Sequence, residues 1–253
     1  MLLSTNKLHG FAIHATDGEL GKVDEFFFDE VNWTVRYLVV DTGAWLTGRR
    51  VLLSPAVLGQ PDWDRHILPV SLTKKQVELS PDIDTDQPIS RQQEEELRRY
   101  FGWANYWVGD PLLADPTFAT GPMGMSPATM AAMAPAHNPE AHADPHLEST
   151  KDVVGCHIQA TDAEVGHVED FIVDDRGWVI RYIVVDTRNF LPGKKVLISP
   201  EWVEKVDWAE GKVRVNLSRE AIRQSPPYNP SAPIDREYES RLYDYYKRPK
   251  YWS

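Results

Sequence analysis

The sequence predicts a mainly β protein that contains two small β-barrels, each followed by a short amphipathic helical tail. Three observations lead to this prediction. One long segment occurs twice within the 253 residues, which indicates a duplicated structural unit. Each copy consists of short runs of β-branched and aromatic residues between turn residues. The end of each copy changes to the spacing of a helix.

The duplication is visible without any gap. The segment ATDGELGKVDEFFFDEVNWTVRYLVVDT starts at Ala15 and returns 145 residues later as ATDAEVGHVEDFIVDDRGWVIRYIVVDT, which starts at Ala160. The same spacing relates further identical residues, namely Val51 with Val196, Leu97 with Leu242, and Tyr106-Trp107 with Tyr251-Trp252. An ungapped match over this length indicates an internal duplication.

The expected boundaries follow from where the duplicated pattern stops. We expect a first repeat with its helical tail over residues 1–108, a linker over 109–149, and a second repeat with its tail over 150–253. The linker contains GPMGMSPATMAAMAPAHNPEAHADPH, which is rich in Pro, Ala and Met and lacks Lys and Arg. Such a composition does not bury enough apolar surface to offset the entropy lost on ordering, so it predicts a flexible segment.

The strands are expected in a regular order within each copy. In the first copy, β-branched and aromatic runs predict strands over residues 11–16, 21–29, 33–40, 51–53 and 67–70. The dipeptide Asp17-Gly18 suits a turn, and Asn32 with its counterpart Gly177 suits a tight hairpin. Several short strands at this spacing are typical of a small barrel, in which closure removes exposed edges.

Helices are expected after the strands. Thr73 and its counterpart Ser218 are candidate N-caps of a short helix. In SRQQEEELRRYF, Ser90 is followed three residues later by Gln93, which matches a capping box. In DREYESRLYDYY of the second copy, Asp235 is expected to take the capping role.

Composition and charge narrow the function. A hydrophobic content of 42% is enough for ordinary cores, so global disorder is excluded. The net charge of −11 disfavours nucleic acid as a partner. The single cysteine, Cys156, allows neither an internal disulfide nor a cysteine-based zinc site. No run of apolar residues is long enough for a transmembrane segment, and the N-terminus has no signal-peptide pattern. We therefore expect a cytoplasmic protein.

The two copies resemble the PRC-barrel domain. The resemblance lies in GELGKVDEFFFDE and WTVRYLVVDTGAWLTGRRVLLSP, and in EVGHVEDFIVDD and WVIRYIVVDTRNFLPGKKVLISP. It covers roughly residues 5–80 and 150–225. That domain occurs in the cytoplasmic part of the photosynthetic reaction-centre H subunit and in a ribosome-maturation factor. The tails resemble extensions of bacterial PRC-barrel proteins. The resemblance implies a compact β-barrel that contacts other proteins and has no shared catalytic residues.

Two kinds of residue are candidates for an interface. Apolar loop residues stand beside basic pairs in both copies, and large apolar side chains at a loop tip can anchor a partner. An equally open interpretation is that they cover the end of the barrel core. These residues are Trp45, Leu46, Arg49, Arg50, Phe190, Leu191, Lys194 and Lys195. The second kind is the Tyr-Trp pair of each tail, which we expect to pack on its own repeat, or else on the other repeat or a partner. These are Tyr106, Trp107, Tyr251 and Trp252.

Other polar residues favour structural roles. An acidic series runs through each copy, and we interpret it as a solvated face rather than a cation site or a docking face for a basic partner. It comprises Asp17, Glu19, Asp24, Glu25, Asp29 and Glu30, with Asp162, Glu164, Glu169, Asp170, Asp174 and Asp175. Arg36 with Asp41, and Arg181 with Asp186, are expected to form structural ion pairs or strand-end caps. The histidines and methionines of the linker are explained by its composition, so we expect no metal, cofactor or catalytic site.

The favoured function is a non-catalytic, intracellular protein-interaction or scaffold module. The resemblance suggests attachment to a photosynthetic, membrane-associated or stress-related complex. The protein partner is not identified by the sequence. Two arrangements stay open: the linker lets both repeats bind one partner bivalently, or the repeats pack on each other as a pseudo-dimer, with a homo-oligomer as a further alternative. An RNA- or ribosome-associated factor and a metal-dependent enzyme are the alternative functions.

Overall fold

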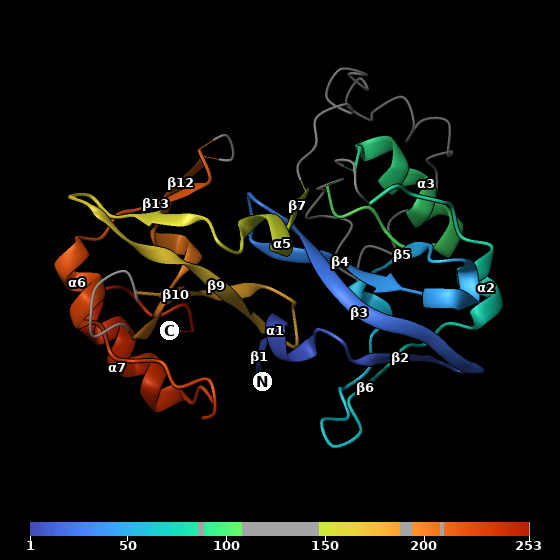
Figure 1. Cartoon of the computed structure of the whole chain (residues 1–253), viewed down its shortest axis with the longest axis horizontal. Helices are drawn as coiled ribbons and strands as arrows, with labels where there is room; N and C mark the ends of the chain where they lie inside the picture. Colours follow the sequence, from blue (N-terminus) through green and yellow to red (C-terminus); the bar gives the residue numbers. More distant parts are fainter. Residues whose placement is uncertain (86–88, 108–146, 188–193, 208–209, 253) are drawn as a thin grey trace, which may run out of the picture. The chain divides into compact units, whose positions relative to one another are not determined.

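The computed structural model describes residues 1–85, 89–107, 147–187, 194–207 and 210–252 (Figure 1). The chain divides into two compact units. One, here called the paired unit, contains a first half, residues 1–78, and a second half, residues 147–253. The other, here called the tail unit, contains residues 79–146. The expected linker lies outside the described residues except for Leu147–Ser149, which form a strand instead.

The paired unit contains two mixed β-sheets. In the first half the strand order is β5-β4-β3-β2-β6, and only β2 and β6 pair in parallel. In the second half the order is β11-β10-β9-β8-β13-β12, with β8 and β13 in parallel. The first set is β2 (Ala12–Ala15), β3 (Gly18–Asp29), β4 (Thr34–Asp41), β5 (Arg50–Leu53) and β6 (Ile67–Pro69). The second is β8 (His157–Gln159), β9 (Glu164–Asp174), β10 (Ile180–Asp186), β11 (Lys195–Ile198), β12 (Val203–Asp207) and β13 (Lys212–Val215).

The sheets differ from the closed barrels that the sequence predicts. Among the described residues, no strand pairing joins β5 to β6 or β11 to β12, so the structure shows two open mixed sheets. The chain leaves the sheet directly after β5 and β11, in the 3₁₀ turns η2 (Pro55–Val57) and η5 (Pro200–Trp202). Both turns begin with a proline, which has no N–H to donate to a strand ladder.

Each half receives its first strand from the other half. Strand β1 (Leu2–Ser4) pairs with β9 of the second half, with Leu3 opposite Val173. Strand β7 (Leu147–Ser149) pairs with β3 of the first half. A one-turn helix follows each of these strands, α1 (Thr5–Leu8) after β1 and α5 (Thr150–Val153) after β7. Figure 1 shows α1 beside β9 of the second half and α5 beside β3 of the first half. The exchange makes the two halves one packed unit.

A buried carboxylate anchors each exchanged segment. Asp170 accepts hydrogen bonds from the hydroxyls of Ser4 (2.5 Å) and Thr5 (2.8 Å) and from the backbone N–H of Asn6 (3.0 Å). Burial raises the pKa of Asp170, and these donors oppose that rise. The counterpart of Asp170 is Glu25, which accepts a hydrogen bond from Ser149. Hydroxyl donors from one half therefore satisfy a buried acid of the other half.

The two halves also meet through backbone hydrogen bonds around a local two-fold axis. Thr34 and Val179 form an isolated antiparallel bridge. The N–H of Val35 donates to the carbonyl of Trp178 (2.8 Å), and the N–H of Ile180 donates reciprocally to the carbonyl of Trp33 (2.7 Å). At the 145-residue spacing, Thr34 corresponds to Val179, Val35 to Ile180 and Trp33 to Trp178. Equivalent residues of the two copies therefore make equivalent contacts, and the junction is symmetric.

The hairpins at this junction contain Asn32 and Gly177, as expected, but other residues take the left-handed conformation. The left-handed residues are Trp33 (φ 50°) and Trp178 (φ 54°), whereas the sequence favours Asn32 and Gly177 for the tight turn. A positive φ is strained for a bulky residue, so packing must hold the tryptophans there. Trp33 stacks on Phe28 with ring centroids 5.2 Å apart, and Trp178 stacks on Phe26 at 6.2 Å. The aromatic core between the halves thus fixes the hairpin ends.

Two glycines allow the long strands to cross their neighbours closely. A Cβ on Gly21 would lie 2.0 Å from the carbonyl oxygen of Asp41, and one on Gly166 would lie 2.2 Å from that of Asp186. Both glycines also have positive φ angles, 152° and 124°. Any larger residue at either position would separate β3 from β4 or β9 from β10.

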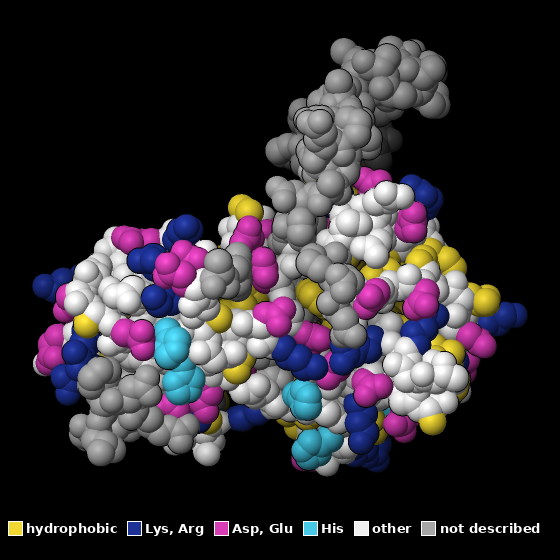
Figure 2. All heavy atoms as spheres, turned by 45° about the horizontal axis from the view of Figure 1, so that its top comes forward, with side chains coloured by type: hydrophobic (Ala, Val, Ile, Leu, Met, Phe, Trp, Pro, Cys, Tyr) yellow, Lys and Arg dark blue, Asp and Glu magenta, His cyan; other side chains and the backbone are white. Residues whose placement is uncertain are grey.

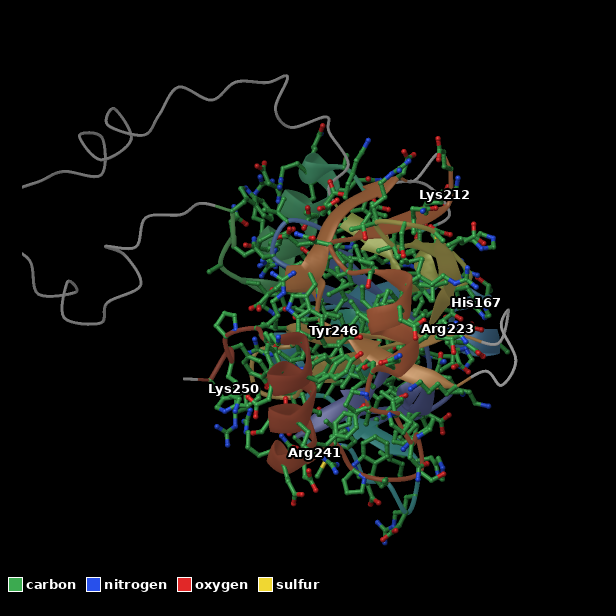
Figure 3. The ribbon with its side chains drawn as sticks, turned by 90° about the vertical axis from the view of Figure 1, so that its left-hand side faces the viewer. His167, Lys212, Arg223, Arg241, Tyr246 and Lys250 are labelled. Carbon is green, nitrogen blue, oxygen red and sulfur yellow. The ribbon has the colours of Figure 1, made fainter. Side chains whose placement is uncertain are left out.

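Helical segments carry the expected caps. In the paired unit these are α2 (Lys74–Glu78), α6 (Arg219–Gln224) and α7 (Arg236–Tyr246), and in the tail unit α3 (Arg91–Phe101). Ser90 and Gln93 form the expected capping box, and Ser218 and Asp235 accept from backbone N–H groups as N-caps. Tyr246, labelled in Figure 3, is the last residue of α7, and the hydroxyl of Tyr245 joins α7 to α6 by donating to the carbonyl of Ala221 (2.8 Å). Of the helices that the structure describes, none has the length and apolar character needed to cross a membrane.

The exchange network generates a stability prediction. Replacing Thr5 by Val removes one donor to Asp170 but keeps the side-chain size, so the full chain should lose about 1.5–3 kcal/mol of unfolding free energy. Urea titration followed by circular dichroism measures this loss. The control is Thr16→Val, because Thr16 is an exposed residue whose hydroxyl donates to the neutral carbonyl of Leu72 (3.2 Å). The variant should lose about 1 kcal/mol or less of unfolding free energy. Equal effects of the two substitutions would contradict the anchoring role of Asp170.

Candidate interaction surface

The Tyr-Trp pair of the second half packs on its own half. The hydroxyl of Tyr251 donates to the buried carboxylate of Glu239 (2.8 Å), which also accepts from the hydroxyl of Tyr182 (2.8 Å). Burial raises the pKa of Tyr251 to about 12, and the bond to Glu239 acts in the same direction. The guanidinium of Arg236 lies 4.1 Å from the ring centroid of Trp252. Tyr251 and Trp252 are thus only partly exposed.

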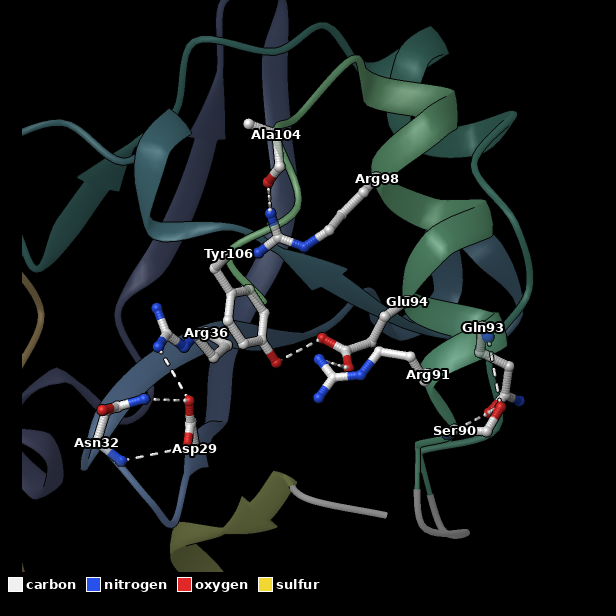
Figure 4. A network of polar contacts seen from close by, with 10 residues as sticks. All are labelled: Asp29, Asn32, Arg36, Ser90, Arg91, Gln93, Glu94, Arg98, Ala104 and Tyr106. Atoms are coloured by element: carbon white, nitrogen blue, oxygen red, sulfur yellow. Dashed lines mark hydrogen bonds and ion pairs between the residues drawn. The ribbon is translucent and has the colours of Figure 1, made fainter. Parts of the chain in front are cut away.

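The Tyr-Trp pair of the tail unit has the same local arrangement (Figure 4). The hydroxyl of Tyr106 donates to Glu94 (2.9 Å), and the guanidinium of Arg91 lies 4.1 Å from the ring centroid of Trp107. Arg98 donates to the carbonyl of Ala104, which holds the chain between the helix and Tyr106. The duplication has therefore preserved one motif, in which a helix carboxylate and arginines hold the aromatic pair.

The loop candidates are also held within the chain. Trp45 lies in the 3₁₀ turn η1 (Gly43–Leu46), is half-buried, and has the ammonium of Lys74 at 4.3 Å from its ring centroid. Leu46 is half-buried beside it. The counterparts Phe190 and Leu191 lie outside the described residues.

The basic pairs beside these loops have partners inside the paired unit. Arg50 lies 3.5 Å from the carboxylate of Asp24, and Lys195 lies 2.5 Å from that of Glu169. The other two bind carbonyl oxygens, Arg49 that of Glu78 (3.1 Å) and Lys194 that of Ser225 (2.5 Å). These contacts hold the four basic groups against their own half.

The arginines of the central strands have different partners from those expected. Arg36 pairs with Asp29 (3.0 Å) and Arg181 with Asp174 (3.0 Å), rather than with Asp41 and Asp186. The reason is geometric, because Asp29 and Asp174 end the neighbouring antiparallel strands and so lie beside the arginines. Burial would raise the pKa of Asp29, but hydrogen bonds from Asn32 and Arg36, drawn in Figure 4, outweigh it and lower the pKa.

A cleft of about 530 Å³ lies between the two halves of the paired unit. The first half contributes the turn between β3 and β4, residues 30–33, where Val31 is 78% exposed. The second half contributes the start of β10, the turn η5, strand β12, and the rings of Tyr243 and Tyr251. Of the interface residues predicted from the sequence that the structure describes, Tyr251 lines this cleft.

Carboxylates dominate the free charge of the cleft. Glu201 and Glu204 are exposed on its wall, and neither has an ion-pair partner among the described residues. The basic residues of the cleft are already paired, Arg181 with Asp174 and Lys205 with Asp207 (3.9 Å). On the face drawn in Figure 2, acidic and basic side chains are interspersed. The cleft therefore offers uncompensated negative charge beside exposed apolar surface.

The first half lacks this acidic wall. The counterparts of Glu201 and Glu204 at the 145-residue spacing are Ala56 and Gly59. The counterpart of Val31 is Arg176. The two copies have thus diverged at the surface while keeping the same junction and the same aromatic motif.

Two further acidic residues, Asp17 and Asp162, have structural contacts. Asp17 accepts from the N–H of Lys74 (2.7 Å) and Asp162 accepts from the N–H of Arg219 (2.7 Å), so each caps the start of a short helix. No group of three or more His, Cys, Asp or Glu residues that could hold a metal ion occurs in the described part of the chain. The Met and His residues of the linker lie outside that part.

Comparison with known protein families shows a match in the second half. Residues 146–222 match the family model of the PRC-barrel domain. This range starts just before β7 and ends in α6, so it contains strands β8–β13 of the second half and the strand β7 that this half supplies to the first. No curated protein of similar sequence was found.

The cleft contains residues that the sequence did not single out as an interface. Glu201, Glu204 and Val31 occur in turns and a short strand, where single charged or apolar residues are common. Glu30 belongs to the acidic series, but its position in the sequence does not indicate that it lines the cleft. The sequence feature that could have indicated this surface is the difference between the two copies, because Glu204 of the second copy corresponds to Gly59 of the first.

The exchanged strand β7 carries an acidic residue whose pKa is affected by Glu30. Glu148 lies in β7, and burial together with the charges of Glu30 and Asp152 raises its pKa to about 7. The carboxyl is therefore protonated in the folded chain below about pH 7 but ionises near its usual pKa of 4.5 when unfolded. Its contribution to stability is complete below about pH 4.5 and is lost as the pH rises through about 7.

The substitution Glu148→Gln removes the charge and keeps the shape. The melting temperature of the variant should exceed that of the wild type at pH 8 and match it near pH 4.5. Thermal unfolding followed by circular dichroism at both pH values measures the difference. Glu204→Gln is the control, because Glu204 is exposed and its charge is already solvated in the folded chain. A gain at pH 8 that also persists at pH 4.5 would show that ionisation of Glu148 is not the cause.

Proposed function

We propose that this chain is a non-catalytic protein-interaction module, built from two PRC-barrel-like halves that act together. The family match to residues 146–222 supports this for the second half. For the first half the support is the duplicated sequence and the corresponding strand order, in which β2–β6 correspond to β8–β11 and β13. PRC-barrel domains contact other proteins and have no shared catalytic residues.

The observation that carries the proposal is the composite cleft between the halves. A surface that marks a docking site combines exposed apolar groups with polar groups that lack internal partners. Val31 is the exposed apolar group, and Glu201 and Glu204 are the polar groups. Because opposite charges complement each other across interfaces, the partner should present basic side chains.

The exchange changes how such a module would bind. Two repeats joined only by a flexible linker would bind a partner bivalently, with affinity set by effective concentration. The halves of this chain instead hold each other through β1 and β7, so a partner meets one preformed surface. Preformed surfaces lose less conformational entropy on binding. The loop with Trp45 and Leu46 and the aromatic pair Tyr106-Trp107 stay proposed as additional contact points.

Photo-crosslinking in the native cells tests the proposal. A photoreactive phenylalanine analogue at Val31 should crosslink a defined protein partner, and the additional substitutions Glu201→Lys and Glu204→Lys should reduce that product about tenfold or more by reversing the charge. The control places the analogue at Arg65, which is 78% exposed and lies outside the cleft. The proposal fails if Val31 and Arg65 give the same products, or if charge reversal leaves the Val31 product unchanged.

A further inference from the structure

Strand β12 is an open edge of the second-half sheet. It stands at the end of the strand order and pairs on one side with β13. Among the described residues no strand pairs with its other side. An open edge presents backbone N–H and C=O groups that an extended peptide can use.

The register shows which residue of β12 presents these groups. The N–H of His157 in β8 donates to the carbonyl of Gly211 (2.8 Å), which fixes the parallel pairing so that both backbone groups of Val213 point towards β8. Val206 lies opposite Val213 in the antiparallel pair. It therefore occupies a non-hydrogen-bonded position, and its N–H and C=O point away from β13.

The cleft follows this edge. Its lining includes four consecutive residues of β12, Val203 to Val206. Because successive side chains of a strand alternate between the two faces of a sheet, a cleft that touches all four lies along the edge rather than on one face. The lining also includes Glu30 and the exposed Val31, so the hairpin end of the first half borders the same cleft as this edge.

The first half has lost the same edge. The counterpart of Val206 is Pro61, which lacks the outward N–H. Pairing in that segment is reduced to the isolated bridges of Leu58 with Val70 and Asp62 with Ile67. Proline is a usual means of blocking an open edge. The second half keeps Val206 and instead has Lys205 and an irregular register between Val203 and Lys205, which limit unspecific pairing.

We propose that β12 accepts an extended, strand-forming segment of a partner protein that carries Lys or Arg side chains. The backbone of the segment would pair with Val206, and its basic side chains would meet Glu201 and Glu204. The main chain gives affinity in this mode of recognition, and side chains give selectivity. This inference rests on the proposed function, since it names the chemistry and the binding mode of the partner at the same cleft.

Peptide binding to the full chain tests the inference. The probe is a fluorescein-labelled octapeptide of alternating Lys and Val, measured by fluorescence anisotropy against the same peptide with Glu in place of Lys. The wild type should bind the Lys–Val peptide, and the variant Glu201→Gln/Glu204→Gln should bind it more weakly. Val206→Pro should weaken binding about tenfold or more, because it removes a hydrogen-bond donor, whereas Val206→Ala should change it by about twofold at most.

Amide hydrogen exchange gives a second readout that does not depend on the folding of the proline variant. In the wild type, saturation with the Lys–Val peptide should slow exchange at the Val206 N–H about tenfold or more. Strand addition is overturned if Val206→Pro binds the Lys–Val peptide as tightly as the wild type does. It is also overturned if the peptide does not protect the Val206 amide from exchange, even when Glu201→Gln/Glu204→Gln weakens binding. It is also overturned if no Lys–Val peptide binds, or if β12 instead mediates a dimer that Val206→Pro converts to a monomer. The crosslinking experiment at Val31 tests the proposed function independently of these results, so the proposed function can hold even if strand addition is wrong.

Discussion

Each half of the paired unit obtains its first strand from the other half, and the rest of the structure depends on this exchange. The hydroxyl groups of Ser4 and Thr5 reach Asp170 of the second half, and Ser149 reaches Glu25 of the first. Separating the halves would remove these hydroxyl donors from the two buried carboxylates, which is costly in a low-dielectric interior. The exchange also sets the hairpin ends of the two halves side by side and so creates the cleft.

Duplication lets one copy keep the scaffold while the other changes its surface. Positions that build the junction match in both copies, as Trp33 and Trp178 do. Positions on the cleft do not match, since Glu204 and Val206 stand where the first copy has Gly59 and Pro61. The asymmetry extends to the exchanged strands, where Glu148 is the counterpart of the buried Leu3. One side of an almost symmetric unit therefore carries the features suited to binding.

Features that depend on neighbouring residues, such as helix caps, can be predicted from the sequence. Features that join segments far apart in the chain cannot be predicted in this way. The caps at Ser90 and Asp235 were predictable because their partners lie within three residues. The exchange was not, because residues 2–4 pair with residues 172–174, and no periodicity records such a distant partner. The left-handed Trp33 was missed because turn propensity favours Asn32, whereas aromatic packing decides the outcome. The cleft combines residues from both halves, so it required the structure.

The most direct test of this account is to cut the chain between its halves. A protease recognition site inserted within residues 109–146 allows the purified protein to be cleaved after folding. The account predicts that the two fragments stay associated at micromolar concentration, elute as one species in size-exclusion chromatography and unfold in a single transition. Fragments that separate on the column, each unfolding independently, would show that the linker rather than the exchanged strands holds the halves together.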